Sequence, residues 1–277
     1  MLYLCATPIG NLGDLTLRVI DALKACDAVY CEDTRHTLTL LNHLDIKKPL
    51  ISCHQHNEKA RAEEIVALLR TGSEIVYVSD AGMPGISDPG AALTAACIRE
   101  DLPFTVLPGA SAVLTAAVLS GLPPQPFTFF GFLPRESKPA KEMLSEVAGC
   151  GHLALLYESP QRVQKTLSQL FTACGDRDAA VLRELTKKFE EVQRGKLSAL
   201  IPLYETPPKG ECVIAVYCPR LSEQATPEAL DTLLQAALHR GLRTKDAAAE
   251  AAEQLGLSKK QAYQRALELS NSDSAGR

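Results

Sequence analysis

A loop rich in glycine and proline, residues 79–90, most constrains what this chain can fold into. It follows an apolar run typical of a buried strand, residues 74–78, and precedes small apolar residues typical of a helix, residues 91–98. Most strand-to-helix connections are only a few residues long, so an ordinary connection is the weaker interpretation. Because glycine has no Cβ, such a loop can bring its backbone against a ligand at the carboxyl end of a strand, where open α/β sheets bind small molecules.

Predicted strands and helices alternate through the first 120 residues. The predicted strands are residues 2–6, 28–31, 74–78 and 104–107. The predicted helices are residues 15–25, 58–70, 91–98 and 110–120. This alternation predicts an α/β fold with a parallel, doubly wound sheet in a first domain, residues 1–120.

A proline-rich stretch, residues 121–126, marks the clearest domain boundary because proline cannot continue a helix. A second α/β domain is expected at residues 127–220. Its predicted strands are residues 127–132, 152–157, 179–182 and 212–218, and its predicted helices are residues 141–147 and 162–171. Residues 134–141 carry two prolines and three basic side chains, which predicts a basic, mobile loop.

A small helical appendage is expected at residues 226–270. Three short helices are predicted, at residues 227–239, 244–255 and 258–269, and the last two resemble a helix-turn-helix because Gly256 and the capping residue Ser258 separate them. Residues 240–266 hold six basic against three acidic side chains. Two interpretations stand equal: a nucleic-acid-binding unit, or a helical cap whose charges are solvated.

Composition bounds the class of protein. The net charge of −4 does not indicate nucleic-acid binding by the whole chain, although local patches can still provide it. No long apolar stretch is free of charged residues, so no membrane span is expected. Nine scattered cysteines without a Cys-x-x-Cys pair, and no basic leader at the N-terminus, predict reduced thiols and a cytoplasmic location.

Two further loops resemble the first in chemistry. Residues 7–14 and residues 108–112 follow predicted strands and bring glycines and hydroxyls to the beginnings of helices. The dinucleotide fingerprint Gly-x-Gly-x-x-Gly and the phosphate-binding Gly-x-x-x-x-Gly-Lys-Ser/Thr are both absent. Three such loops after parallel strands predict one crevice for a polar small molecule, and no set of metal ligands stands out.

Four segments together resemble the class III, tetrapyrrole-methylase-like methyltransferases: residues 7–14, 32–35, 79–90 and 108–112. The resemblance covers nearly the whole chain and is closest to the branch that methylates ribosomal RNA. It implies methylation of the ribose 2′-hydroxyl of a cytidine in 16S rRNA of the small ribosomal subunit, with S-adenosylmethionine as cofactor. Where members that act on tetrapyrroles carry Gly-Asp-Pro, this chain has Ser-Asp-Ala-Gly at residues 79–82, which fits the ribosomal RNA branch.

The same resemblance implies two α/β domains with the cofactor in the cleft between them, and a homodimer. The residues that it places on the cofactor are Pro8, Asp80, Gly82, Met83, Ser111, Ala112, Tyr157, Leu185 and Gly210.

The reaction itself suggests catalytic residues. A ribose hydroxyl is a poor nucleophile at neutral pH, so a base or a cation beside it would help. Glu32 or His54 is the candidate base and Arg35 the candidate phosphate contact. Glu32 and Arg35 follow the predicted strand 28–31, and His54 likewise follows residues 50–52, which places all three at the ligand-binding edge. The competing interpretation is that Asp33 and Arg35 cap one helix and residues 57–58 begin the next.

RNA contacts are expected from exposed basic side chains, although for any single one a solvated surface charge is the competing interpretation. The first choices are Arg135, Lys138 and Lys141, followed by Arg162, Lys187 and Lys188, and then Arg243, Lys245, Lys259 and Lys260.

Other classes of protein remain as alternatives. One is a methyltransferase for a small molecule such as a tetrapyrrole. Another is a DNA-binding regulator whose α/β part senses a ligand, although Lys259, Lys260 and Arg265 make a thin base-reading set. A non-catalytic scaffold fits least well, because packing alone does not require three convergent glycine-rich loops.

Overall fold

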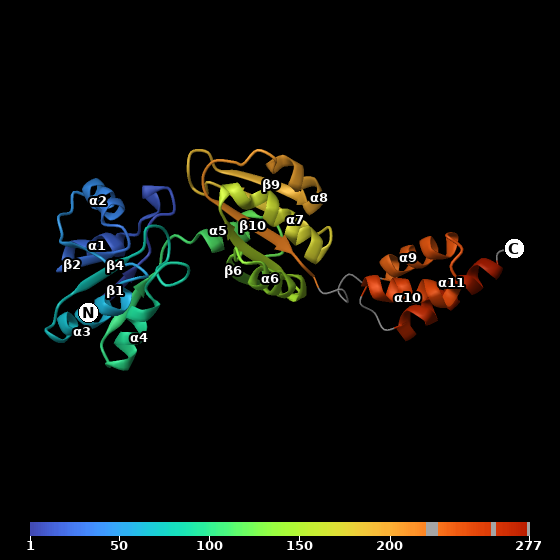
Figure 1. Ribbon diagram of the computed structural model, residues 1–277, viewed down its shortest axis with the longest axis horizontal. Helices are drawn as coiled ribbons and strands as arrows, with labels where there is room; N and C mark the ends of the chain where they lie inside the picture. Colours follow the sequence, from blue (N-terminus) through green and yellow to red (C-terminus); the bar gives the residue numbers. More distant parts are fainter. Residues whose placement is uncertain (220–226, 256–258, 276–277) are drawn as a thin grey trace. The chain divides into compact units, whose positions relative to one another are not determined.

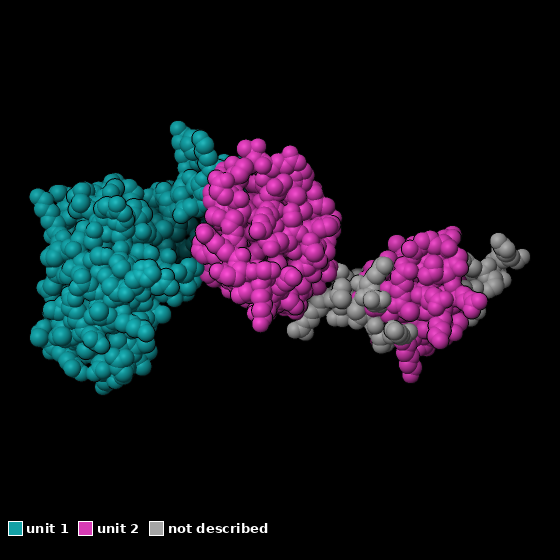
Figure 2. Space-filling model, viewed as in Figure 1, with its two compact units in different colours: residues 1–119, 182–192, 209–213 teal, residues 120–181, 193–208, 214–277 magenta. Residues whose placement is uncertain are grey.

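The computed structural model describes residues 1–219, 227–255 and 259–275, and its chain forms two compact units (Figure 2). Unit 1 contains residues 1–119, 182–192 and 209–213, and unit 2 contains residues 120–181, 193–208 and 214–277. Unit 1 therefore draws two short segments from beyond the proline-rich stretch.

Unit 1 is built on a five-stranded sheet in the order β3-β2-β4-β1-β5, whose neighbouring strands are all parallel. Strands β1, β2 and β4 of this sheet are labelled in Figure 1. The strands are β1 (Leu2–Cys5), β2 (Ala28–Cys31), β3 (Leu50–Ser52), β4 (Ile75–Val78) and β5 (Phe104–Leu107). Both β2 and β4 are buried along their whole length, as expected of parallel strands covered on both faces. The predicted doubly wound α/β class is confirmed.

Helices cover both faces of this sheet. The helices are α1 (Leu17–Ala25), α2 (Thr34–His43), α3 (Glu58–Arg70), α4 (Ala91–Arg99) and α5 (Ala112–Leu119), and a short 3-10 helix, η1 (Leu12–Asp14), precedes α1. Alternate residues of one strand enter different cores: Tyr77 packs with side chains of α3 and α4, whereas Val76 and Val78 pack with those of α1 and α2. This period of two is the geometry of a strand between two helical layers.

The second sheet has the strand order β6-β7-β10-β8-β9. Its strands are β6 (Phe127–Phe132), β7 (Leu153–Glu158), β8 (Asp178–Arg183), β9 (Glu191–Lys196) and β10 (Cys212–Tyr217). The helical elements of this half are α6 (Ser137–Gly149), η2 (Pro160–Arg162), α7 (Val163–Cys174), α8 (Leu197–Leu200) and η3 (Ile201–Tyr204). The sequence pattern did not indicate β9, which is largely exposed and polar.

The structure overturns one local prediction in this half. Residues 134–141 are not a continuous mobile loop, because α6 begins at Ser137 and includes Lys138 and Lys141. Pro139 lies in the first turn of this helix, where a proline costs little because the first backbone N–H groups have no partner within the helix. Its presence was therefore a misleading signal for a loop.

The C-terminal region forms a three-helix bundle of α9 (Pro227–His239), α10 (Thr244–Leu255) and α11 (Lys259–Ala275). Leu230 and Leu234 of α9 pack against alanines of α10 and α11 in a small core. The helix α11 continues six residues beyond the predicted end at 269. The predicted turn residues Gly256 and Ser258, and the predicted boundary at 226, lie outside the described residues. No described helix is long and apolar enough to cross a membrane.

Candidate active site

Two loops at the carboxyl edge of the first sheet are joined by their backbones. The Thr7 N–H donates to the Gly82 carbonyl at 2.9 Å, and the Gly82 N–H donates back to the Thr7 carbonyl at 3.0 Å. The Thr7 hydroxyl also donates to the Ser79 carbonyl at 3.2 Å. Gly82 has φ +77°, and a Cβ there would lie 3.3 Å from Ile9 Cγ2, so this position needs a glycine.

The third loop reaches the same edge because β1 lies between β4 and β5. Gly109 packs directly on the residue after β1: a Cβ on Gly109 would come within 2.9 Å of Ala6 Cβ. The Ser111 hydroxyl accepts a 3.4 Å hydrogen bond from the Leu114 N–H in the first turn of α5. Ser111 therefore has a structural role as a helix cap beside the role predicted for it on the cofactor.

A carboxylate from α3 secures the far end of the loop 79–90. Glu58 Oε1 accepts hydrogen bonds from the Gly90 N–H at 2.7 Å and the Ala92 N–H at 3.0 Å, at the beginning of α4. These are two of the backbone donors that a helix N-terminus leaves without partners, and a negative charge there is favourable. Residues 57–58 do begin α3, as the competing interpretation held, and Glu58 also caps the neighbouring helix.

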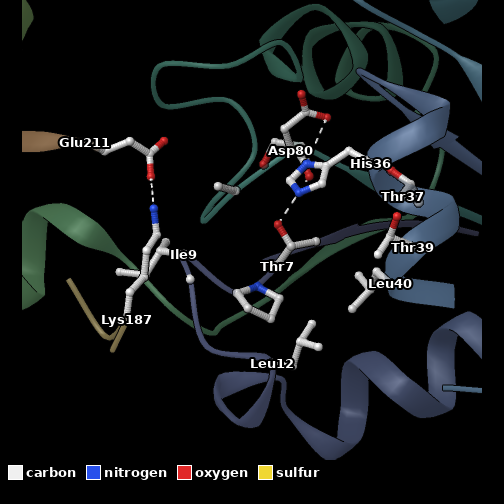
Figure 3. Close-up of a pocket in the computed structure, with 14 residues that line it drawn as sticks. Thr7, Ile9, Leu12, His36, Thr37, Thr39, Leu40, Asp80, Lys187 and Glu211 are labelled. Carbon is white, nitrogen blue, oxygen red and sulfur yellow. Dashed lines mark hydrogen bonds and ion pairs between the residues drawn. The ribbon is translucent and has the colours of Figure 1, made fainter. Parts of the chain in front are cut away.

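A pocket of about 740 Å³, measured with its open mouth, lies within unit 1 (Figure 3). Among the residues predicted to bind the cofactor, Pro8 and Asp80 line it. Asp80 Oδ1 accepts from the Asp33 N–H at 3.1 Å and lies 3.9 Å from His36 Nδ1. The other lining residues are Thr7, Ile9, Gly10, Leu12, His36, Thr37, Thr39, Leu40, Ser79, Ala81, Lys187 and Glu211.

Lys187 holds one wall of this pocket. Its ammonium group donates to Glu184 Oε1 at 2.9 Å and to Glu211 Oε2 at 2.7 Å. Its stem leaves no room for a side chain at Gly10, where a Cβ would come 2.3 Å from Lys187 Cγ. Lys187 was predicted as an RNA contact, and the structure shows that its charge is already shared between two carboxylates. The glycine at position 10 was the only sequence signal for this contact.

Gly210 is close to the same ion pair. Its φ is +90°, and a Cβ there would lie 2.2 Å from Glu184 Cδ. The next N–H, of Glu211, donates to Glu184 Oε1 at 3.0 Å. Gly210 thus lies beside the wall that Lys187 forms, and Leu185 is buried, but neither residue lines the pocket itself.

Four carboxylates gather near the ends of β2 and β4. Burial raises the pKa of Glu32, and the nearby charges of Asp88, Asp80 and Asp33 raise it further. Burial, followed by the charge of Asp80, also raises the pKa of Asp88. A carboxyl group with a raised pKa at the ligand-binding edge is a candidate acid or base.

Asp33 and Arg35 pair with each other. Asp33 Oδ1 accepts from the Arg35 N–H at 2.8 Å, which caps α2, and Asp33 Oδ2 accepts from Arg35 Nη2 at 2.6 Å. These hydrogen bonds hold the pKa of Asp33 well below its usual range. Asp33 therefore caps α2, as the interpretation opposed to a phosphate-binding role held. The Arg35 side chain is nevertheless largely exposed.

No described residue hydrogen-bonds to Nδ1 of the second candidate base, His54. Its backbone N–H donates to Asn57 Oδ1 at 2.8 Å, but Nδ1 of its ring is buried without a hydrogen-bond partner among the described residues. A catalytic imidazole is normally oriented through its second nitrogen. This counts against His54, although neither Glu32 nor His54 lines the pocket.

The remaining predicted residues lie in several places. Met83 and Ala112 are partly exposed residues of unit 1, in the loop 79–90 and at the beginning of α5. Tyr157 belongs to unit 2, where its ring lies 4.7 Å from Phe129 and 5.5 Å from Phe132, measured between ring centroids. The exposed predicted RNA contacts include Arg135, Lys138, Lys141 and Lys260, and Lys259 is the first residue of α11.

Comparisons with known proteins identify the family. Residues 1–201 match the Tetrapyrrole (Corrin/Porphyrin) Methylases, and residues 224–270 match the RsmI C-terminal HTH domain. The chain belongs to the tetrapyrrole methylase family. The chain is therefore a methyltransferase that uses S-adenosylmethionine.

Curated relatives within this methylase family match most of the chain. The chain is 42% identical over 273 residues to "Ribosomal RNA small subunit methyltransferase I" of Synechocystis, covering 97% of this chain and 98% of the relative. It is 46% identical over 201 residues to the Bacillus subtilis protein of the same name, covering 73% and 69%.

Solved structures of methylases show the same fold. Diphthine synthase matches with a TM-score of 0.63 at 15% identity, covering 79% of this chain and 89% of its own. The methyltransferase CobJ matches with a TM-score of 0.60 at 19% identity, covering 78% and 92%. At these identities the likeness concerns the fold alone.

The residues present suit the cofactor of a methylase. S-adenosylmethionine carries an ammonium group and a nucleoside, which call for a carboxylate and closely approaching backbone groups. Asp80 supplies a carboxylate on the pocket wall, and the loops at Gly82 and Gly109 pack too closely to admit a Cβ without strain. Among the described residues, no group of three or more His, Cys, Asp or Glu is arranged to hold a metal ion.

We expect Glu32→Gln to raise the melting temperature at pH 7. The raised pKa of Glu32 means that the folded chain holds its proton at pH values where the unfolded chain, with an ordinary pKa of about 4.3, has lost it. The stability that the protonated group contributes is therefore lost as pH rises through this window. A neutral amide avoids that loss.

Thermal unfolding between pH 4 and pH 8 measures the effect, with the exposed Glu63→Gln on α3 as the control. The difference between Glu32→Gln and the wild type should shrink toward pH 4. A melting temperature of Glu32→Gln equal to or below that of the control at pH 7 would contradict the electrostatic account.

Proposed function

We propose that this protein methylates the ribose 2′-oxygen of cytidine 1402 in 16S rRNA of the small ribosomal subunit. The observation that carries the proposal is the match along 97% of the chain, at 42% identity, to a relative named for this class of substrate. The match includes the C-terminal three-helix bundle, which corresponds to a domain specific to that branch. The cytoplasm, where ribosomal subunits are made in bacteria, is the proposed location.

The cofactor residues follow from the loops of unit 1. Asp80 and Pro8 line the pocket. Gly82 and Met83 belong to the loop 79–90, Ser111 belongs to the loop 108–112, and Ala112 begins α5. Gly210 lies against the Glu184 carboxylate that Lys187 contacts, Leu185 follows Glu184 in the chain, and Tyr157 is assigned from unit 2 by resemblance. When bound, S-adenosylmethionine supplies an already activated methyl group, so the protein mainly aligns the reacting atoms.

Methyl transfer to isolated ribosomal particles tests the function directly. The wild type is incubated with radiolabelled S-adenosylmethionine and unmodified small subunits, with free 16S rRNA and a tetrapyrrole precursor in parallel, and the label is mapped by mass spectrometry. We expect label on one ribose 2′-oxygen of 16S rRNA. Label on the tetrapyrrole alone would contradict the proposed substrate and leave the family assignment standing.

Glu32 is the proposed base that accepts the proton of the 2′-hydroxyl. Its raised pKa makes it a better proton acceptor near neutral pH than an ordinary carboxylate, because a base works best when its pKa lies close to the working pH. Arg35 is proposed to contact a phosphate of the RNA, since its side chain is exposed although Asp33 holds one edge of the guanidinium.

We expect Glu32→Gln to slow single-turnover methyl transfer by about 100-fold or more, with S-adenosylmethionine binding unchanged. His54→Gln should retain most of the rate. In the wild type, the rate should rise with pH through the raised pKa of Glu32, and this limb should be missing in Glu32→Gln. Near-normal rates in both variants would show that neither residue is the base.

The RNA contacts are proposed at exposed basic side chains. Arg135, Lys138 and Lys141 lie at and before the beginning of α6 and share one short stretch of exposed chain. Lys259 and Lys260 lie at the beginning of α11. In contrast, Arg240 and Arg265 of the same bundle are paired with Glu250 and Asp231, which leaves their charges less available to RNA.

The protein is also proposed to form a homodimer through α5. All residues of this helix except Thr115 are apolar, yet Leu114 and Val118 are 56% and 76% exposed, and a helix of this composition is normally buried. A charged side chain at this surface would prevent two copies from packing together, so we expect Val118→Glu to halve the mass measured by light scattering. The control is Leu17→Glu on α1, another exposed apolar position. A monomeric wild type would contradict the proposal.

A further inference from the structure

The turn between β8 and β9 is closed by its own hydrogen bonds. The Lys187 N–H donates to the Glu184 carbonyl and the Glu190 N–H donates to the Lys187 carbonyl, both at 3.0 Å. The Glu190 carboxylate in turn accepts from the Thr186 N–H at 2.7 Å. This turn belongs to residues 182–192 of unit 1, the unit that contains the pocket.

The backbone of this turn is strained. Glu184 and Thr186 have φ values of 52° and 64°, a left-handed conformation that residues with a Cβ adopt at a cost. The Thr186 hydroxyl is also buried without a hydrogen-bond partner among the described residues. Strain of this kind is retained where the surrounding structure enforces it, and it is concentrated at functional sites.

The anchored turn presents two side chains to solvent. Lys187 fastens it to the pocket wall through Glu184 and Glu211, and the next two residues, Lys188 and Phe189, are exposed. Phe189 is 66% exposed, and Lys188 Nζ lies 5.6 Å from the centroid of its ring. Lys188 forms no ion pair with any described residue, so its charge is available to a ligand.

An exposed aromatic ring with a cation over it suits single-stranded RNA. A base stacks on the ring, and the ammonium group attracts a phosphate of the same strand. A single exposed phenylalanine would by itself be ordinary. Here it stands on a strained, hydrogen-bonded turn, two residues along the chain from a side chain that lines the pocket.

Methylation of a 2′-hydroxyl also creates a need for such a surface. A ribose hydroxyl of an RNA strand is more accessible to a cofactor held in this pocket when its nucleotide has left the stack. Bases splayed from a strand are held by stacking on aromatic side chains.

We propose that Phe189 is a stacking platform for a base of the RNA strand next to the methylated nucleotide, with Lys188 contacting the phosphate beside it. The inference rests on the proposed function, since it assumes an RNA substrate. The turn between β8 and β9 would then form the part of the substrate site that binds an unpaired base.

The chain contains no tryptophan, which allows a direct test. Phe189→Trp in the full-length protein introduces the sole tryptophan at the proposed platform. On titration with unmodified small subunits we expect quenching of its fluorescence, because a stacked base quenches an indole. The matched control is Phe171→Trp, at an exposed phenylalanine of α7. Quenching that is absent, or equal in both variants, would overturn the proposal.

Steady-state kinetics supply the second readout. We expect Phe189→Ala to raise the KM for small subunits about 10-fold to 100-fold, the range for loss of one base–aromatic stack, with S-adenosylmethionine binding and the melting temperature unchanged. Phe189→Trp should retain the wild-type KM and Phe189→Leu should not, because leucine keeps the apolar bulk without the ring. A wild-type KM in Phe189→Ala, or in Phe189→Leu, would overturn the platform while leaving the proposed function intact. A wild type that transfers no methyl group to ribosomal RNA would instead refute the proposed function.

Discussion

The pair of backbone hydrogen bonds between Thr7 and Gly82 is the constraint on which the rest of the site depends. It joins the loop after β1 to the loop after β4, and so converts two flexible connections into one surface. The adjacency of β4, β1 and β5 makes this pairing possible, since their carboxyl ends meet at one edge of the sheet. Gly82 permits the approach because it has no side chain. Its left-handed backbone and the nearby Ile9 side chain leave little room for a Cβ at this position.

Some charged groups at the site are paired and stabilise the fold, whereas others lie beside like charges and destabilise it. Lys187 between Glu184 and Glu211, and Glu58 at the N-terminus of α4, are charges with compensating partners, and they hold loops in place. Glu32 and Asp88 are partly buried beside other carboxylates, which opposes their ionisation. Such an arrangement lowers stability while making a carboxyl group more basic, and the proposed chemistry needs that property.

Local patterns were sufficient for most of the fold. The bounds of β2, α3, β5 and β6 agree with those expected, because each element shows in its own residue order the apolar or β-type run, or the helical period, that predicts it. The pattern was insufficient for β9, whose side chains are largely exposed and polar, and for the beginning of α6, where Pro139 indicated a loop. In both places the structure depends on neighbouring elements that a local pattern does not contain.

The sequence by itself determined the parallel α/β architecture, the three glycine-rich loops and the family, since these depend on residue order and on glycines that no other residue replaces. Only the tertiary structure decided which charges meet. Lys187 and Glu211 lie more than 170 residues along the chain from Gly10, yet they form one pocket wall with it. Asp80, which follows β4, accepts a hydrogen bond from the Asp33 N–H after β2, and the ring nitrogen Nδ1 of His54 has no hydrogen-bond partner among the described residues. The physical reason is that burial and the distances between charges arise from the packing of distant segments. Burial and these distances determine whether a carboxyl group caps a helix, forms an ion pair or acts as a base.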